Sequence, residues 1–258
     1  MKIKRRISIN LNQKQADFLN NFSIEVNPGL STFYINDATI YEKVKSKLQE
    51  WNAVELFESE FTKDEMLCAS SYAMIALWHN GYPQPESSYI EDTYDISDYC
   101  KICGIGLKQK EAFKLRREVE WRNKKVMHLN WVFDELFVPI NIYESIFKPF
   151  GIEKKPVFTV KEKKFSSETC QLSIPFTELN LEIPPNLKFS VCSCGRKKYL
   201  PIVDSFFPKY LDSPEQHIFK TKEYFGSGHS ARNQIIISKS MYNVLVDNKF
   251  KLSYTPLS

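Results

Sequence analysis

The chain has 258 residues, of which 43% are hydrophobic, 26% are charged and 14% are aromatic. This composition excludes general disorder and provides a large core, and the length allows one large or two modest domains. The formal net charge of +4 is a weak indication of a nucleic-acid partner, but residues 51–100 are strongly acidic and residues 101–130 are basic. These stretches either are solvated faces that pair with each other or present a field to a charged macromolecule.

Residues 1–60 predict a small sheet with one helix. Apolar side chains at alternate positions predict a strand at 3–11, and two more short strands follow at 22–26 and 32–35. Apolar residues then recur with helical spacing, which predicts an amphipathic helix over 39–51. A further strand is expected at about 53–58.

A second, largely buried helix is expected over residues 63–78. Thr62 and Glu65 fit a capping box, and an apolar run follows them. Glycine and two prolines at 81–85 end this run, because glycine favours a helix C-cap and proline cannot continue a helix. The acidic, tyrosine-containing stretch 86–99 then predicts a long loop that leads into the first pair of cysteines.

Two later segments share one order of elements. Residues 137–157 and 236–257 each predict a strand, a short helix and a second strand. Each segment follows a Cys-Gly step, Cys103-Gly104 in the first and Cys194-Gly195 in the second. Strand–helix–strand units are common, so the match is either an accident or a weak internal duplication in which the two cysteine turns are equivalent.

Together these elements predict an α+β protein. We expect mostly antiparallel sheets, a few flanking helices and a zinc-ribbon-like pair of cysteine turns. The cysteine spacing favours two closely packed parts. Residues 1–97 are predicted to form an N-terminal α+β part, and residues 98–258 are predicted to form a part with two cysteine turns and two strand–helix–strand units.

Four of the six cysteines form two close pairs. Cys100 and Cys103 have two residues between them and a glycine after them, whereas Cys192 and Cys194 have only one residue between them. Two thiolates at such spacing fall on one side of a tight turn, and two turns complete a tetrahedral four-cysteine zinc site. In a reducing compartment, paired cysteines are more often metal ligands than disulfides. The sequence therefore predicts a structural zinc ion.

The irregular second pair leaves alternatives open. One of its cysteines could lie outside the site, with His217 or His229 folding in as a replacement ligand. The thiols could also be free and buried, or could carry redox chemistry, although the C-x-x-C lacks the context of a thioredoxin-like site. Cys68 and Cys170 are most simply small core hydrophobes.

The order of these features resembles the double-CXXCG motif proteins. The shared features are Cys100-Lys-Ile-Cys103-Gly104, then Cys194-Gly195-Arg196, Leu200-Pro-Ile-Val-Asp204 and a C-terminal segment closing on Thr255-Pro-Leu257. The resemblance covers roughly residues 98–258, and the single spacer Ser193 departs from the motif. The family is bacterial, and some members are identified as immunity proteins that pair with secreted or contact-delivered toxins. The resemblance therefore implies a cognate toxin as the partner.

No catalytic motif was found in the sequence. It contains no zinc-protease helix, phosphate-binding loop, dinucleotide fingerprint or nucleophile elbow. Asp134 and Glu135 could be an acid/base pair, but we expect them at outward positions on a strand. A protein without enzymatic activity is therefore expected.

The candidates for partner contact lie on two loops that follow the second cysteine turn. The first loop is basic, and the second contains glycines beside aromatic residues. The candidate residues are Arg196, Lys197, Lys198, Tyr199, Tyr224, Phe225, His229 and Arg232.

The main functional prediction is a cytoplasmic interaction protein that binds and neutralises a cognate toxin. The basic start of the chain lacks the apolar region of a signal peptide, and no apolar run is long enough to span a membrane. The alternative is a zinc-ribbon protein that binds nucleic acid. Its phosphate contacts would be Lys108, Lys110, Arg116, Arg117 and the basic turn 196–198.

Overall fold

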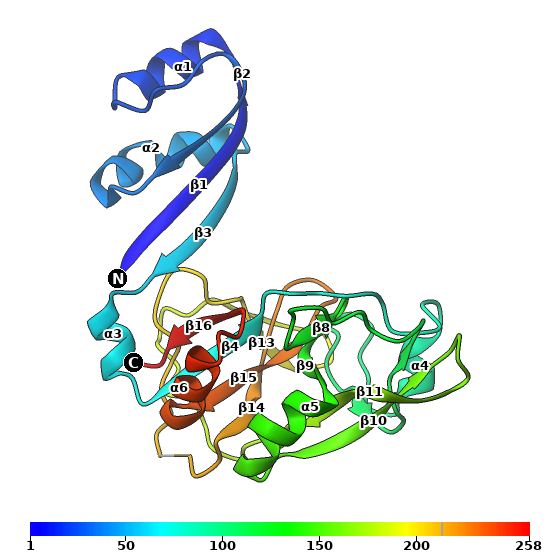
Figure 1. Ribbon diagram of the computed structural model, residues 1–258. Helices are drawn as coiled ribbons and strands as arrows, with labels where there is room; N and C mark the ends of the chain where they lie inside the picture. The colour runs from blue at the N-terminus through cyan, green and yellow to red at the C-terminus, as the bar shows by residue number, and fades with distance from the viewer. Residues whose placement is uncertain (213) are drawn as a thin grey trace. The chain divides into compact units, whose positions relative to one another are not determined.

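The computed structural model describes residues 1–212 and 214–258, which divide into two compact units (Figure 1). The first unit contains Met1–Cys68 and Ile202–Ser205, and the second contains Ala69–Pro201 and Phe206–Ser258. The division thus lies well before the boundary predicted at residue 97. The reason is strand β4 (Ser71–Ala76), which pairs with two strands from the end of the chain and so belongs to the second unit.

The first unit is a small antiparallel sheet with two helices. The strand order is β2 (Gly29–Ile35), β1 (Lys2–Leu11), β3 (Val54–Glu60), and the helices are α1 (Gln13–Asn20) and α2 (Ala38–Glu50). Alternate residues of β1 are buried against apolar residues of both helices. The predicted strands at 3–11 and 53–58 and the predicted helix at 39–51 are therefore confirmed.

Two predictions in this unit were incomplete or wrong. Helix α1 was missed, although Asn12 and Gln15 form a capping box at its start that the sequence displays. Residues 22–26 are not a strand. Ile24 and Val26 are buried, but the side chain of Asn20 both accepts from the N–H and donates to the carbonyl of Val26, so this backbone is satisfied without a neighbouring strand.

The helix predicted over 63–78 is also wrong. Helix α3 ends after one turn and a half (Lys63–Cys68), and the apolar residues that follow form β4. Strand β4 lies between β15 and β16 in its sheet, and no side chain on either of its faces is exposed. A short apolar run that is central in a sheet cannot be distinguished from a buried helix by periodicity alone.

The second unit contains two larger sheets (Figure 1). The first has the order β7 (Lys114–Leu115), β10 (Glu153–Thr159), β11 (Lys164–Ser173), β9 (Val132–Pro139), β8 (Met127–Leu129). The second has the order β12 (Phe189–Val191), β13 (Lys197–Tyr199), β14 (Ile218–Phe225), β15 (Arg232–Ser238), β4, β16 (Leu252–Pro256). Most neighbouring strands are antiparallel, so the protein is a mixed α/β protein rich in antiparallel sheet.

The predicted loop 86–99 contains some regular structure. A short helix, α4 (Tyr89–Thr93), leads into strand β5 (Tyr94–Asp95), which pairs with β6 (Lys108–Gln109). This small two-stranded pairing brackets the first cysteine pair and brings its two flanks together.

Both predicted strand–helix–strand units are present. The first is β9, the helical segment 140–150 that begins with α5 (Ile140–Ile142), and β10; the second is β15, α6 (Lys239–Asp247) and β16. In each unit the two strands are separated in the sheet by one strand that is antiparallel to both, β11 in the first and β4 in the second. This common topology agrees with a duplication of the strand–helix–strand units alone, because the intervening strands are not equivalent in sequence. The intervening strand follows the first unit in sequence but precedes the second by more than half the chain.

A buried histidine connects the two sheets of the second unit. The Nε2 atom of His128, on β8, accepts a hydrogen bond from the backbone N–H of Ala76 on β4, at 3.0 Å. Because Nε2 is an acceptor, the proton of the neutral ring lies on Nδ1, which donates to the carbonyl of Glu135 at 2.8 Å. Burial lowers the pKa of His128 to about 4.

This histidine predicts a loss of stability in weak acid. The unfolded chain binds a proton on His128 below about pH 6.5, whereas the folded chain resists protonation until about pH 4. Stability from the neutral ring is therefore complete above pH 6.5 and is lost as the pH falls through this window, in total by about 3 kcal/mol. Urea unfolding of the native chain and of His128→Gln at several pH values checks this. The variant should be less stable at pH 7, but its free energy of unfolding should change less between pH 6.5 and pH 4. An equal change with pH in both proteins would contradict the prediction.

Asp134 and Glu135 do not both point outward as predicted. Glu135 is buried, and its carboxylate forms an ion pair with the buried Lys220 on β14 and accepts from the amide of Gln171 on β11 at 2.8 Å. Burial by itself lowers the pKa of Lys220, but the attraction of Glu135 and Asp134 outweighs burial and raises it. Glu135 therefore joins strands of the two sheets.

Among the described residues, no helix combines the length and apolar character needed to cross a bilayer.

Candidate metal centre

The first cysteine turn is closed by backbone hydrogen bonds. The N–H of Cys100 donates to the carbonyl of Ile105 at 2.9 Å, and the N–H of Gly104 donates back to the carbonyl of Cys100 at 2.8 Å. Gly104 has a φ of 81°, the left-handed conformation that glycine adopts without strain. The turn aims the N–H groups of Cys103 and Ile102 at the Cys100 thiol, and these donors lower its pKa to about 6. Burial raises the pKa of Cys103 to about 11.

The second turn is the connection of a β-hairpin. Strands β12 and β13 pair through Val191 and Lys197, and between them Cys192 and Gly195 are joined by a backbone hydrogen bond of 2.9 Å. Gly195 has a φ of 82°, close to that of Gly104. The N–H of Cys194 donates to the Cys192 thiol and lowers its pKa. The hairpin thus accommodates the shorter cysteine spacing with the same kind of glycine-closed turn.

The two turns bring all four thiols together. The Sγ atoms of Cys100, Cys103, Cys192 and Cys194 lie within 4.8 Å of one another. The pair Cys100–Cys192 and the pair Cys103–Cys194 are each separated by 3.8 Å between sulfur atoms, too far for a disulfide bond. These four cysteines could hold a metal ion, so the single spacer does not exclude either member of the second pair.

The histidines considered as replacement ligands have other partners. His217 bonds through Nδ1 to the hydroxyls of Ser238 and Ser240, and His229 bonds through Nδ1 to the carbonyl of Lys101. Of the two single cysteines, Cys170 is buried as predicted, whereas Cys68 is exposed and is not a core residue.

Basic side chains of the second turn tie it to the first. Arg196 donates to the carbonyls of Asp98 and Ile105, at 2.6 and 3.0 Å, and to the carboxylate of Asp98 at 2.6 Å. Lys198 is buried and donates to the carbonyl of Cys103 at 2.7 Å and to two carbonyls of the loop 226–230 at 2.8 Å. These cations satisfy backbone carbonyls around the cysteines, so the thiols are held in place by both turns and by this loop.

The other predicted contact residues divide by exposure. Tyr199 and Phe225 are buried, so, like Lys198, their side chains support the scaffold and offer no contact surface. Lys197 and His229 are exposed, and the ammonium of Lys197 lies 3.9 Å from the ring centroid of Phe189. Tyr224 and Arg232 are half-buried, and Arg232 lies over the ring of Phe133.

Sequence reasoning missed two parts of this centre. The carboxylate of Asp98 accepts from Arg196. In the sequence, only the position of Asp98 two residues before Cys100 indicated a role in this centre. The loop 226–230 packs directly against the first turn, because a Cβ atom on Gly104 would lie 2.2 Å from the carbonyl oxygen of His229. No local pattern links residues so far apart in the chain.

The two glycines provide a matched pair of variants. Gly195→Ala would meet no atom within 4 Å, so it is expected to cost only the left-handed strain of about 1–2 kcal/mol. Gly104→Ala has the same strain and also clashes with His229, so we expect a clearly larger loss, together with weaker retention of metal. Thermal unfolding and metal analysis of both variants measure the difference. Equal losses would show that the loop does not press on the first turn.

Comparison of the chain with protein-family models, with curated proteins and with solved structures finds no significant match.

Proposed function

We propose that this chain is a cytoplasmic, non-enzymatic interaction protein whose structural zinc ion holds its binding surface in place. The arrangement of the four sulfur atoms carries the proposal. In a tetrahedral site with Zn–S bonds of about 2.3 Å, the sulfurs lie about 3.8 Å apart. Two of the six sulfur–sulfur distances are 3.8 Å and all six are within 4.8 Å, which supports a zinc ion between the two turns.

A site of this kind is structural. Four thiolates fill the coordination sphere of zinc, and no position is left for a water molecule or substrate. The ion would join Cys100 to Cys192, which are 92 positions apart in sequence, and would therefore close a long loop of the second unit. Thiolates remain reduced in the cytoplasm, which supports that location.

The surface beside the second turn supports an interaction role. Strand β12 lies at the edge of its sheet, and Phe189 and Val191 on it are 52% and 61% exposed. An exposed apolar edge strand can pair with a strand of another protein, and apolar side chains then contribute specificity. Lys197 lies beside Phe189 on the neighbouring strand. We propose that a cognate toxin, the partner implied by the resemblance to double-CXXCG motif proteins, binds here.

Expression in the natural host tests this function. The tagged chain should recover one toxin-like protein from the host. That protein should prevent growth when it is expressed alone, and co-expression of this chain should restore growth. Phe189→Asp with Val191→Asp should abolish recovery and protection while leaving metal content unchanged. Protection that survives this double variant would contradict the proposed surface, and the absence of any protective activity against the recovered protein would contradict the function.

Nucleic-acid binding is a second candidate. Arg196 and Lys198 are occupied with backbone carbonyls of the cysteine turns, which weakens the phosphate contacts expected there. Arg116 and Arg117, in contrast, line a basic cleft in the second unit.

A further inference from the structure

The basic cleft has a volume of about 1110 Å³ and lies apart from the cysteine centre, because none of the four cysteines lines it. Its walls come from residues 78–84, from residues 115–124 and from Val160 and Lys161. The volume exceeds that of most sites for small ligands, which leaves room for a chain-like ligand. The basic residues of the cleft are Arg116, Arg117, Arg122, Lys124 and Lys161.

Two carboxylates in the cleft offset only part of this positive charge. Glu118 is half-buried and accepts from the hydroxyl of Ser166 at 2.6 Å, so it faces the protein. Glu120 lies 3.7 Å from Arg117 and 3.5 Å from Arg122, and all three side chains are more than 60% exposed. Exposed ion pairs of this kind are weak, so both guanidinium groups can exchange Glu120 for an external anion.

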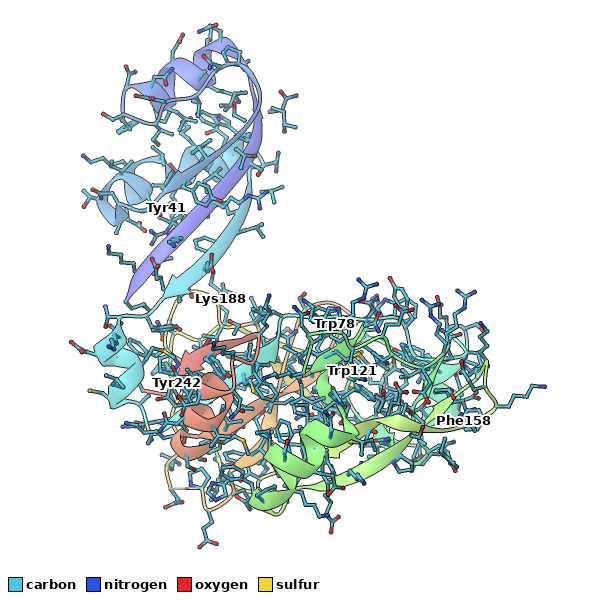
Figure 2. The ribbon with its side chains drawn as sticks, in the orientation of Figure 1. Tyr41, Trp78, Trp121, Phe158, Lys188 and Tyr242 are labelled. Atoms are coloured by element: carbon cyan, nitrogen blue, oxygen red, sulfur yellow. The ribbon has the colours of Figure 1, made fainter. Side chains whose placement is uncertain are left out.

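An aromatic cluster continues the wall of the cleft. Trp78, Tyr82 and Trp121 line it, and Figure 2 labels the two tryptophans, whose ring centroids are 5.3 Å apart. The ring of Tyr82 lies 4.5 Å from that of Trp131, which in turn stacks at 5.8 Å on Tyr89. Trp131 is 51% exposed and Tyr82 is 39% exposed despite these contacts. Two exposed aromatic rings therefore border the cleft: Tyr82 lines it, and Trp131 lies next to Tyr82.

The backbone of Trp131 adopts a conformation that is uncommon for a bulky residue. Trp131 lies in the two-residue turn between β8 and β9 and has a φ of 69°. A bulky side chain in the left-handed region costs roughly 1–2 kcal/mol, which glycine or asparagine would avoid at this place in a turn. Half of Trp131 is buried against Tyr82 and Tyr89, and the other half is open to a ligand.

We propose that this cleft binds single-stranded nucleic acid. The phosphates of the nucleic acid would contact Arg116, Lys124 and Lys161, and its bases would stack on Tyr82 and Trp131. A groove of cations bordered by exposed aromatic rings is the combination that single-stranded nucleic acid requires, because that polymer alternates charged groups with flat bases. An acidic protein segment could also bind the cations, but it has no bases to stack on the exposed aromatic rings. The site is independent of the metal centre and of the toxin surface proposed above.

Fluorescence anisotropy with a labelled 12-nucleotide oligodeoxythymidylate tests the proposal. Binding at 50 mM salt should weaken roughly 20-fold at 200 mM salt, as expected for about three phosphate contacts to a single strand. Trp131→Gly removes the stacking surface, so it should weaken binding roughly tenfold or more. Relief of the left-handed strain offsets part of the packing that is lost with Tyr82 and Tyr89, so the variant should remain folded. Lys161→Glu should weaken binding and reduce the salt dependence, whereas the matched control Lys14→Glu, an exposed lysine of the first unit, should change neither.

Three results would overturn the proposal. They are the absence of binding at 50 mM salt, unchanged affinity in Trp131→Gly, and equal affinity for a 12-residue polyglutamate peptide. The last result would identify the cleft as a site for an acidic protein segment. Circular dichroism of each variant establishes that it is folded. Because the edge strand β12 is unchanged in all of these variants, their results bear on the cleft and leave the toxin test unaffected.

Discussion

Cys103→Ser is expected to abolish metal binding and to lower the unfolding temperature of the second unit by about 6–12 °C. The native protein should contain about one zinc ion per chain. A serine hydroxyl does not replace a thiolate ligand, and the lost ion no longer joins the two turns, so we expect a stability loss of about 3 kcal/mol or more. For a unit of this size, each kcal/mol lowers the midpoint by about 2–4 °C. Metal analysis and thermal unfolding of purified protein provide the measurements.

Cys68→Ser is the matched control, because Cys68 is exposed and lies outside the cluster. It should leave metal content and unfolding temperature unchanged. A chelator should reproduce the effect of Cys103→Ser in the native protein and should have no effect on the variant. If the native protein contains no zinc, or if Cys103→Ser retains the full complement, the structural zinc site is refuted.

Lys220→Met is expected to destabilise the second unit by about 3–5 kcal/mol. The side chains of Lys220 and Glu135 are 5% and 9% exposed. Removal of the cation would leave the carboxylate of Glu135 buried without its counter-charge, and this is the costly step. Replacing both residues, in Lys220→Met with Glu135→Leu, should recover part of the loss, because no buried charge remains, while the buried amide of Gln171 loses one acceptor. Urea unfolding of both variants gives the two free energies.

An exposed ion pair of the same chemistry is the control for this prediction. Lys148 and Glu144 are 61% and 41% exposed, so Lys148→Met should change stability by less than about 1 kcal/mol.

The stability that the pair Lys220–Glu135 contributes depends on pH with a definite sign. The folded pKa of Lys220 is raised above 10.5, so the contribution of the pair is complete below pH 10.5 and is lost as the pH rises through the folded value. If Lys220→Met costs no more than Lys148→Met, the pair does not support the fold.

The cysteine pairs were the most informative local feature of the chain. Each pair is closed by a glycine that adopts a left-handed conformation, so the sequence indicated the form of both turns. The meeting of the four thiols is confirmed, whereas zinc as the metal stays a prediction. The contact residues next to the second turn were less predictable. Lys198 is buried by the first cysteine turn and the loop 226–230, and Tyr199 is buried against the rings of Phe189 and Phe225. A basic loop in the sequence gives no indication of these contacts.

In the first unit and in the strand that follows it, local patterns likewise identified some elements and missed others. Apolar spacing identified β1, α2 and β3, because each has one buried face and its periodicity is a local property. It failed for β4, where no side chain is exposed on either face of the strand, so polar and apolar residues do not alternate. It also failed for residues 22–26, where the side chain of Asn20 takes the place of a partner strand.

The sequence by itself determined the composition of the core, the two cysteine turns, and both strand–helix–strand units of the second unit. Only the tertiary structure decided that β4 completes the second of these units, that Glu135 meets Lys220, and that a basic cleft lies beside exposed aromatic rings. The physical reason is the range of the interactions. Turn chemistry and apolar periodicity act over a few residues, whereas strand neighbours, buried ion pairs and clefts depend on residues that folding brings together from distant parts of the chain.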